Sequence, residues 1–245
     1  MAMIVCHGPK GGAGTTFVTA HLAMGLADAG LDVTVLTIAG RDTLPLHFGL
    51  HPAVTLPSFT ASAEEAVVAG GINLRHYHKA AEDPDFLPMM RDLGYLEQGK
   101  DRVIVIDVPA GEHRFAQHLV PHASAHLCPL QAHPDTLALL PQVLEEAGYE
   151  GFARTAIAIN GLDETRRLSR HGSAFIRELA GDRLVGRIRL DEAVPEAIAM
   201  LQPLARYAPA SLALADVRKV AAAIIPTVDV SLDGGLDPQD ESRAA

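Results

Sequence analysis

Residues 7–16 read HGPKGGAGTT, a glycine-rich loop that follows an apolar run and precedes a helical pattern over residues 16–29. Glycines at this density let consecutive backbone N–H groups turn toward one point, and the positive end of the next helix adds to the field there. Loops between a strand and a helix bind nucleotide phosphates in many α/β proteins, and Thr16 stands where such loops bind Mg²⁺. The segment therefore predicts a phosphate-binding loop; a tight turn without a ligand is the alternative.

Around this loop, short apolar runs alternate with helical stretches along the chain. Runs that are apolar throughout are typical of strands covered on both faces. We expect strands at residues 3–7, 33–38, 103–107, 125–130, 155–160 and 184–188. We expect helices at residues 16–29, 112–120, 134–147, 164–180, 192–201 and 210–225. This alternation predicts an α/β fold with a mainly parallel sheet and helices on both faces.

Two segments depart from the alternation. Over residues 44–100 the strand signal fades, and helical pieces at 62–69 and 86–98 favour an elaborated connection on the same domain. Residues 226–245 are rich in glycine and aspartate, with five acidic side chains against one arginine. That composition cannot bury a core. The sequence predicts one domain over residues 1–225 and an acidic flexible tail over 226–245.

Composition excludes several classes of protein. The chain has 245 residues, of which 48% are hydrophobic, and 30 acidic against 20 basic residues give a net charge of −10. A chain of this kind is not wholly disordered, and its acidic balance argues against coating nucleic acid. We expect neither a membrane span nor a signal peptide. Cys6 and Cys128 lie in apolar runs and are interpreted as buried, reduced thiols of a cytoplasmic protein.

The loop differs from the usual phosphate-binding pattern G-x-x-x-x-G-K-[ST] at one position. Thr15 stands where the lysine is expected, and Lys10 stands near the start of the loop. This arrangement resembles the deviant Walker A motif of the ParA/MinD ATPases. The resemblance implies a single-domain P-loop NTPase fold, ATP and Mg²⁺ as ligands, and a homodimer formed across ATP. It also implies that Lys10 reaches the phosphates of the nucleotide bound by the partner subunit.

Later segments are similar to other motifs of that family. Residues 103–111, VIVIDVPAG, resemble the Walker B strand and switch II, and residues 189–197 with 202–204 resemble the loop and helix that close over the base. The resemblance implies that Thr16 and Asp107 hold the metal and that Asn160 meets the adenine edge. The nucleotide-binding residues it implies are Lys10, Gly11, Gly12, Ala13, Gly14, Thr15, Thr16, Asn160 and Pro203.

Departures from the family pattern bear on the chemistry. Family members usually end their second strand in Asp-x-Asp, where this chain has Thr37 and Ala39. Thr15 also removes a cation that would offset charge during phosphoryl transfer. We expect weak or absent hydrolysis, with ATP holding a dimer together, and assign no catalytic residue. Asp42 is the one carboxylate near the missing pair; a solvated loop acid is favoured over a displaced switch residue.

The Gly-Thr-Thr ending of the glycine loop, residues 14–16, resembles that of one branch of the ParA/MinD family, the BcsQ (YhjQ) proteins of bacterial cellulose-synthesis operons. That branch implies a scaffold or regulator of cellulose synthase assembly or localisation, and hence of biofilm formation. A cycling ATPase that positions DNA or another cargo is the alternative, followed by a pseudo-enzyme without nucleotide and, last, a metabolic ligase.

Other signals are weaker. His118, His122 and His126 recur at four-residue intervals, but Pro121 interrupts the helix and no further ligand completes a zinc set. The arginine-rich residues 164–189 favour a solvated face or an acidic protein partner over DNA. The chain ends without a basic amphipathic helix, so we expect no direct membrane anchor and recruitment to the inner membrane only through a partner.

Overall fold

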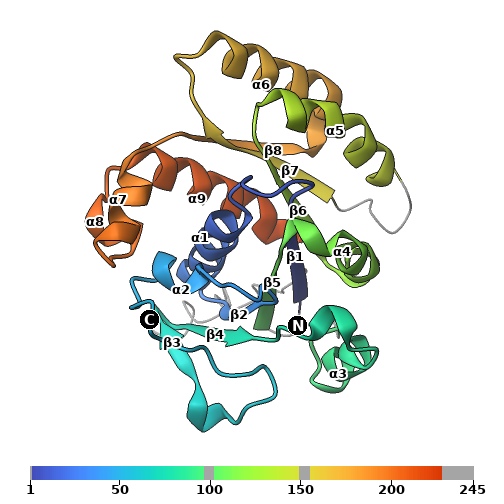
Figure 1. The fold of residues 1–245 in the computed structure, drawn as a ribbon, viewed down its shortest axis with the longest axis vertical. Helices are drawn as coiled ribbons and strands as arrows, with labels where there is room; N and C mark the ends of the chain where they lie inside the picture. Colours follow the sequence, from blue (N-terminus) through green and yellow to red (C-terminus); the bar gives the residue numbers. More distant parts are fainter. Residues whose placement is uncertain (1, 97–101, 149–154, 228–245) are drawn as a thin grey trace, which may run out of the picture.

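The computed structural model describes residues 2–96, 102–148 and 155–227. Within these ranges eight strands form one sheet in the order β3-β4-β2-β5-β1-β6-β7-β8 (Figure 1). Neighbouring strands run parallel except β3 and β4, which are antiparallel. The strands are β1 (Ala2–His7), β2 (Asp32–Thr37), β3 (Val67–Ala69), β4 (Ile72–His76), β5 (Arg102–Val108), β6 (Ala125–Leu130), β7 (Thr155–Leu162) and β8 (Leu184–Arg189). The predicted α/β fold with a mainly parallel sheet is confirmed.

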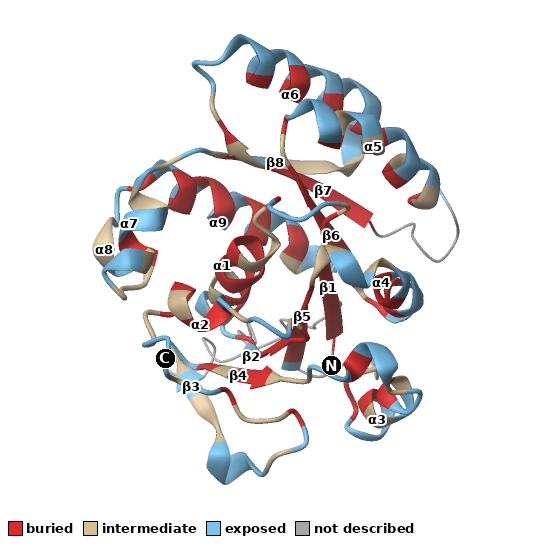
Figure 2. Cartoon of the chain, in the orientation of Figure 1, coloured by how far each residue is buried: buried red, intermediate tan, exposed pale blue. Residues whose placement is uncertain are grey.

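Helices cover both faces of this sheet. They are α1 (Thr15–Asp28), α2 (Leu44–His47), α3 (Phe86–Asp92), α4 (His113–Leu119), α5 (Pro134–Glu146), α6 (Arg167–Ala180), α7 (Ala193–Ala199), α8 (Leu204–Tyr207) and α9 (Leu212–Ile224). The helices α1 and α9 pack on one face, against alternate strand residues such as Ile4 and Val35. The helices α3 to α6 cover the other face, against residues such as Val5 and Ile157. Figure 2 shows the buried residues concentrated in the central strands and in α1.

The segment over residues 44–100 differs from its prediction. Residues 67–76 form a β-hairpin, and only Ala63–Glu65 makes a short 3₁₀ turn, so the helix predicted over 62–69 is wrong. Gly70 and Gly71 connect the two strands, both with positive φ, as tight hairpin turns require. The strand β4 then pairs in parallel with β2. The predicted helix over 86–98 ends at Asp92, and residues 97–98 lie outside the described part.

At the C-terminus, α9 is followed by a 3₁₀ turn at Ile225–Thr227, and the remainder of the predicted tail lies outside the described residues. The division into residues 1–225 and 226–245 thus stays a prediction. No helix in the described ranges combines the length and apolar character needed to cross a bilayer.

Parallel strands bring distant segments together. The strands β1, β2, β5, β7 and β8 all end at the same edge of the sheet, so the segments that follow them meet there. Ligands of open α/β sheets bind at this carboxyl edge.

Candidate nucleotide-binding site

A cavity of about 760 Å³ lies at the carboxyl edge of the sheet. Small-molecule sites in proteins typically measure about 300–1,000 Å³, so the cavity is large enough for a nucleotide. It is lined by the glycine loop and by the segments that follow β2, β5, β6, β7 and β8. Among the lining residues are Lys10, Gly11, Gly12, Gly14, Thr15, Thr16, Ala39, Arg41, Asp107, Pro109, Asn160, Arg189, Asp191 and Pro195.

The loop backbone has a shape that only glycine adopts easily. Gly12 and Gly14 have φ of 85° and 79°, in the left-handed region. A Cβ on Gly14 would lie 2.1 Å from the side-chain nitrogen of Asn160, so a larger residue cannot fit there. A Cβ on Gly11 or Gly12 would meet no atom within 4 Å, because these residues border open space. The loop and the start of α1 therefore leave room for an anion next to the helix N-terminus.

Thr16 and Asp107 meet at the start of α1. The Thr16 hydroxyl donates to Asp107 Oδ2 at 2.8 Å, and the Thr19 hydroxyl donates to Oδ1 at 3.2 Å. Burial raises the pKa of Asp107 to about 6; the two threonine hydroxyls oppose that shift, and the nearby charge of Asp42 adds to it. A hydroxyl and a poorly solvated carboxylate are oxygen ligands of the kind that Mg²⁺ takes, so these residues fit the metal.

Asn160, the sixth residue of β7, is held against the loop. Its amide nitrogen donates to the carbonyl oxygen of Ala13 at 2.8 Å. Its amide oxygen can then accept a hydrogen bond from a ligand in the cavity, such as the amino group of adenine. Ala13 itself does not line the cavity; its contribution is this carbonyl.

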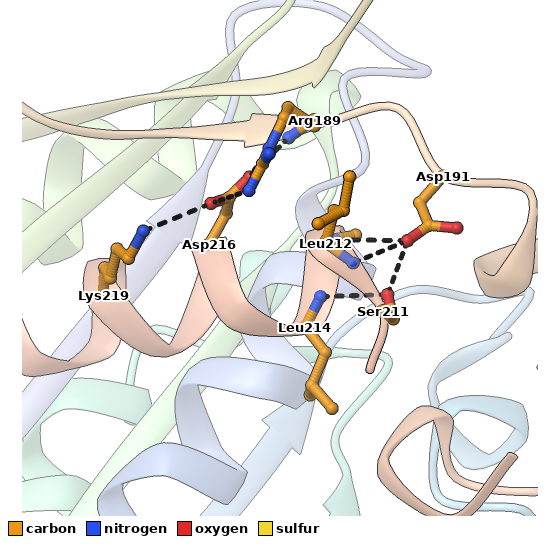
Figure 3. Close-up of polar contacts among 8 residues, drawn as sticks. Arg189, Asp191, Ser211, Leu212, Leu214, Asp216 and Lys219 are labelled. Carbon is orange, nitrogen blue, oxygen red and sulfur yellow. Dashed lines mark hydrogen bonds and ion pairs between the residues drawn. The ribbon is translucent and has the colours of Figure 1, made fainter. Parts of the chain in front are cut away.

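The part of the lining that follows β8 is fixed by two aspartates (Figure 3). Asp191 Oδ2 accepts hydrogen bonds from the Ser211 hydroxyl at 2.7 Å and from the backbone nitrogen of Leu212 at 2.9 Å. The Ser211 hydrogen bond is the main reason that the pKa of Asp191 lies below its ordinary value. Asp216 holds the Arg189 guanidinium through bonds of 2.6 and 2.9 Å. Burial alone would raise the pKa of Asp216, but the hydrogen bonds and charge of Arg189 bring it below the ordinary value.

Sequence reasoning included Asp191 only as part of residues 189–197 and missed Asp216, because both side chains act across elements that are distant in sequence. It also placed Pro203 in the site, whereas Pro203 does not line the cavity. Pro203 lies against Gly49, where an added Cβ would be 2.6 Å from Pro203 Cδ. The prolines in the lining are Pro109 and Pro195. We therefore leave Pro203 out of the proposed nucleotide site.

Lys10 lines the mouth of the cavity, and its ammonium forms an ion pair with Asp135 in the first turn of α5. Both side chains are about half exposed. In this state the lysine is held by its own chain.

Where the family pattern has two acids, the structure has none. Thr37 is fully buried and its hydroxyl accepts from the backbone nitrogen of Ala39 at 3.3 Å, while Ala39 lines the cavity. Asp42 is half-buried, and its Oδ1 accepts from the nitrogen of Leu44 at 2.8 Å. Burial raises the pKa of Asp42 above its ordinary value, so the expectation of a solvated acid was wrong. It faces a separate cavity of about 240 Å³ beside His76.

The histidines proposed as weak metal candidates are dispersed. The rings of His118 and His122 have centroids 6.4 Å apart, whereas His126 is buried in β6 and bonds to Thr155 Oγ1 at 3.0 Å. In the described part of the chain, no three His, Cys, Asp or Glu side chains are grouped to hold a metal ion.

Solved structures with this fold define the class. The chain is similar to the septum site-determining protein MinD from Pyrococcus horikoshii, complexed with Mg-ADP, at 22% identity, covering 91% of this chain and 95% of that one with a TM-score of 0.70. It is similar to MinD in the MinC:MinD complex of Aquifex aeolicus, at 17% identity, 92% and 96% coverage and a TM-score of 0.71. A ParA family ATPase from Chlorobium tepidum gives 17% identity, 90% and 97% coverage and a TM-score of 0.71. The fold is that of the ParA/MinD P-loop proteins, as the motif predicts.

The family follows from a second comparison. A family model described as cellulose biosynthesis protein BcsQ matches residues 73–225, more than half of the chain. The chain belongs to the BcsQ family. The matched residues do not include the glycine loop, so the loop and the family match are separate signals that agree. No curated protein sequence matches the chain.

Proposed function

We propose that this chain is an ATP-binding scaffold or regulator of cellulose synthase assembly or localisation, that it forms a homodimer across ATP, and that it hydrolyses ATP weakly or not at all. The family assignment supports the cellulose pathway, and the MinD structure with Mg-ADP supports a magnesium–nucleotide ligand. The alternative within the same fold is a cycling ATPase that positions DNA or another cargo.

One observation carries the proposal of weak hydrolysis. The cavity has a glycine loop and the Thr16–Asp107 pair, but Thr15 and Ala39 stand where a cation and a carboxylate would act. Phosphoryl transfer depends on positioning the nucleophile and on offsetting charge at the transferring group. The loop amides and Thr16 can bind phosphates and orient a metal. No carboxylate from the end of β2 orients water, because Thr37 is buried and Ala39 has no polar group.

Dimer formation requires a change at Lys10. In the single chain its ammonium is paired with Asp135, and it must leave that partner to reach phosphates bound by a second chain. An exposed ion pair of this kind contributes about 0–1 kcal/mol, so ATP binding can readily displace it.

The arginine-rich segment supports a protein partner. Arg166 pairs with Asp163 at 2.8 Å, and Arg170 donates to the carbonyls of Glu164 and Thr165. Three further arginines, Arg167, Arg177 and Arg187, have no carboxylate partner within the described residues. The helix α6, which carries Arg167 and Arg177, also exposes three apolar side chains, Leu168, Phe175 and Leu179.

Mixed apolar and basic surface of this kind fits an acidic segment of a partner protein better than nucleic acid, given the net charge of −10. Such a partner would bring a cytoplasmic chain to the inner membrane. A mobility shift with random duplex DNA tests this part: we expect no shift with Mg·ATP, and a salt-sensitive shift would favour the DNA-positioning alternative.

Light scattering with nucleotides tests the dimer. We expect a dimer mass with Mg·ATP and a monomer mass with Mg·ADP, while Lys10→Ala stays monomeric in ATP and still binds it. A mass that is independent of nucleotide would reject the proposed dimer. Steady-state turnover above about 1 s⁻¹, the low end for ordinary enzymes, would favour the cycling ATPase.

A further inference from the structure

The cavity has few positive side chains for a ligand that carries several negative charges. Thr15 leaves the glycine loop without the usual lysine. Among the described lining residues, the cationic side chains are Lys10, Arg41 and Arg189.

Two of these three are already bound by carboxylates of the same chain. Lys10 pairs with Asp135, and Arg189 makes a two-bond contact with Asp216 at 2.6 and 2.9 Å. Two parallel bonds from guanidinium to carboxylate are strong and directional, so Arg189 is fixed as part of the wall.

Arg41 remains free, because its side chain is exposed and no carboxylate pairs with it within the described ranges. Its backbone lies at the end of the cavity where Thr16 and Asp107 meet. In the register of β2 and β5, Thr37 is directly opposite Asp107, and residues 38–41 continue past that aspartate. The neighbouring Asp42 is close enough for its charge to act on Asp107.

We propose that Arg41 binds the terminal phosphate of a nucleoside triphosphate and supplies the positive charge that the loop lysine supplies in the usual pattern. This inference rests on the proposed function, because it requires the cavity to bind Mg·ATP. A guanidinium matches the geometry of phosphate oxygens and donates up to two parallel hydrogen bonds. Because a diphosphate lacks the group that Arg41 meets, the residue would favour ATP over ADP.

Calorimetric titration of Arg41→Ala with Mg·ATP and Mg·ADP tests the proposal. We expect the affinity for ATP to fall about 10- to 100-fold and that for ADP to fall less than about threefold, as for loss of one charged hydrogen-bonding partner. Arg41→Lys should lie between wild type and Arg41→Ala. The matched control is Arg91→Ala, an exposed arginine of α3 outside the cavity, which should change neither affinity.

A second variant tests the replacement of one cation by another. Thr15→Lys restores the loop lysine, so adding Arg41→Ala in that background should cost much less ATP affinity than in the wild type. The role of Arg41 would be overturned if Arg41→Ala lost equal affinity for ATP and ADP, or lost none. It would also be overturned if Arg41→Ala cost as much ATP affinity in the Thr15→Lys background as in the wild type. If the wild-type chain itself binds no Mg·ATP, the proposed function fails and Arg41 with it.

Discussion

At the scale of single residues, Asp107 is a buried carboxylate whose negative charge is unfavourable in the nucleotide-free site. Its side chain is 3% exposed, and its partners are two threonine hydroxyls rather than a cation. Burial therefore raises its pKa to about 6, against an ordinary value of 3.8. A carboxylate in this setting gains from a divalent cation, which offsets the cost of burial.

Asp107→Asn should stabilise the nucleotide-free protein. Between pH 4 and about 6 the folded wild type holds a proton at Asp107 that the unfolded chain has lost, so this group reduces stability as the pH rises through that window. The stability gained by the variant should grow from pH 4 to 6, reach on the order of 1–3 kcal/mol, and stay constant to pH 8.

Urea unfolding of wild type and Asp107→Asn at pH 5 and pH 8 measures this difference. Comparing the two proteins removes the effect of the buried histidines, whose lowered pKa values act in the opposite direction. The exposed Asp92→Asn serves as control and should be neutral. A variant less stable than wild type at pH 8 would show that the buried charge is already compensated.

At the scale of secondary structure, α9 joins the wall of the cavity to the loop helix. Its N-terminus is capped by Ser211, whose hydroxyl accepts from Leu214, and by Asp191 from the segment after β8 (Figure 3). Along its length α9 approaches α1 so closely that a Cβ on Gly25 would lie 2.6 Å from Ala221 Cβ. The segment after β8, which lines the cavity, thus depends on the position of α9.

Asp191→Ala tests this dependence. The substitution removes the acceptor for the Ser211 hydroxyl and for three backbone N–H groups, so we expect a loss of about 1–2 kcal/mol in unfolding free energy. Mg·ATP should also bind more weakly, since residues 189–191 lose their anchor. Thermal unfolding gives the first quantity. Glu192→Ala, the exposed neighbouring acid, should leave both unchanged, and an Asp191→Ala protein as stable as that control would contradict the capping role.

At the scale of the whole molecule, six strand ends build one cavity, and the same edge carries the residue expected to bridge two chains (Figure 1). Lys10 lies at the mouth of that cavity and is held by Asp135 of α5. The single chain therefore holds Lys10 in an internal ion pair, and the proposed dimer would exchange that pair for phosphate.

Asp135→Asn should favour the ATP dimer. Removing the competing carboxylate frees Lys10, and because an exposed pair contributes at most about 1 kcal/mol, the dimer dissociation constant should fall by up to about fivefold. Analytical ultracentrifugation in Mg·ATP measures it. Asp32→Asn breaks another exposed pair, with Arg102, and should have no effect. Weaker dimerisation of Asp135→Asn would mean that Asp135 itself contributes to the interface.

Much of this fold follows from local patterns in the sequence. The six predicted strands lie within two residues of the observed ones, because each is an apolar run with turn residues at its ends. The strands β3 and β4 escaped prediction because β3, at the edge of the sheet, is only three residues long and β4 is partly polar; the Gly70–Gly71 pair was the usable signal. The roles of Asp216 and Arg41 depend on residues that are distant in sequence. Asp216 binds Arg189, and Arg41 lines a cavity built from several strand ends, which no local pattern reveals.

The proposed function requires that the cavity holds ATP and does not readily hydrolyse it, and the nucleotide that stays bound reports on both properties. The chain is incubated with excess Mg·ATP, separated from free nucleotide by gel filtration, acid-denatured, and analysed for ATP and ADP by ion exchange. We expect close to one nucleotide per chain, mostly as intact ATP. Bound nucleotide recovered mainly as ADP would show that hydrolysis proceeds without the usual lysine, and a chain without nucleotide would contradict the claim that this cavity binds ATP.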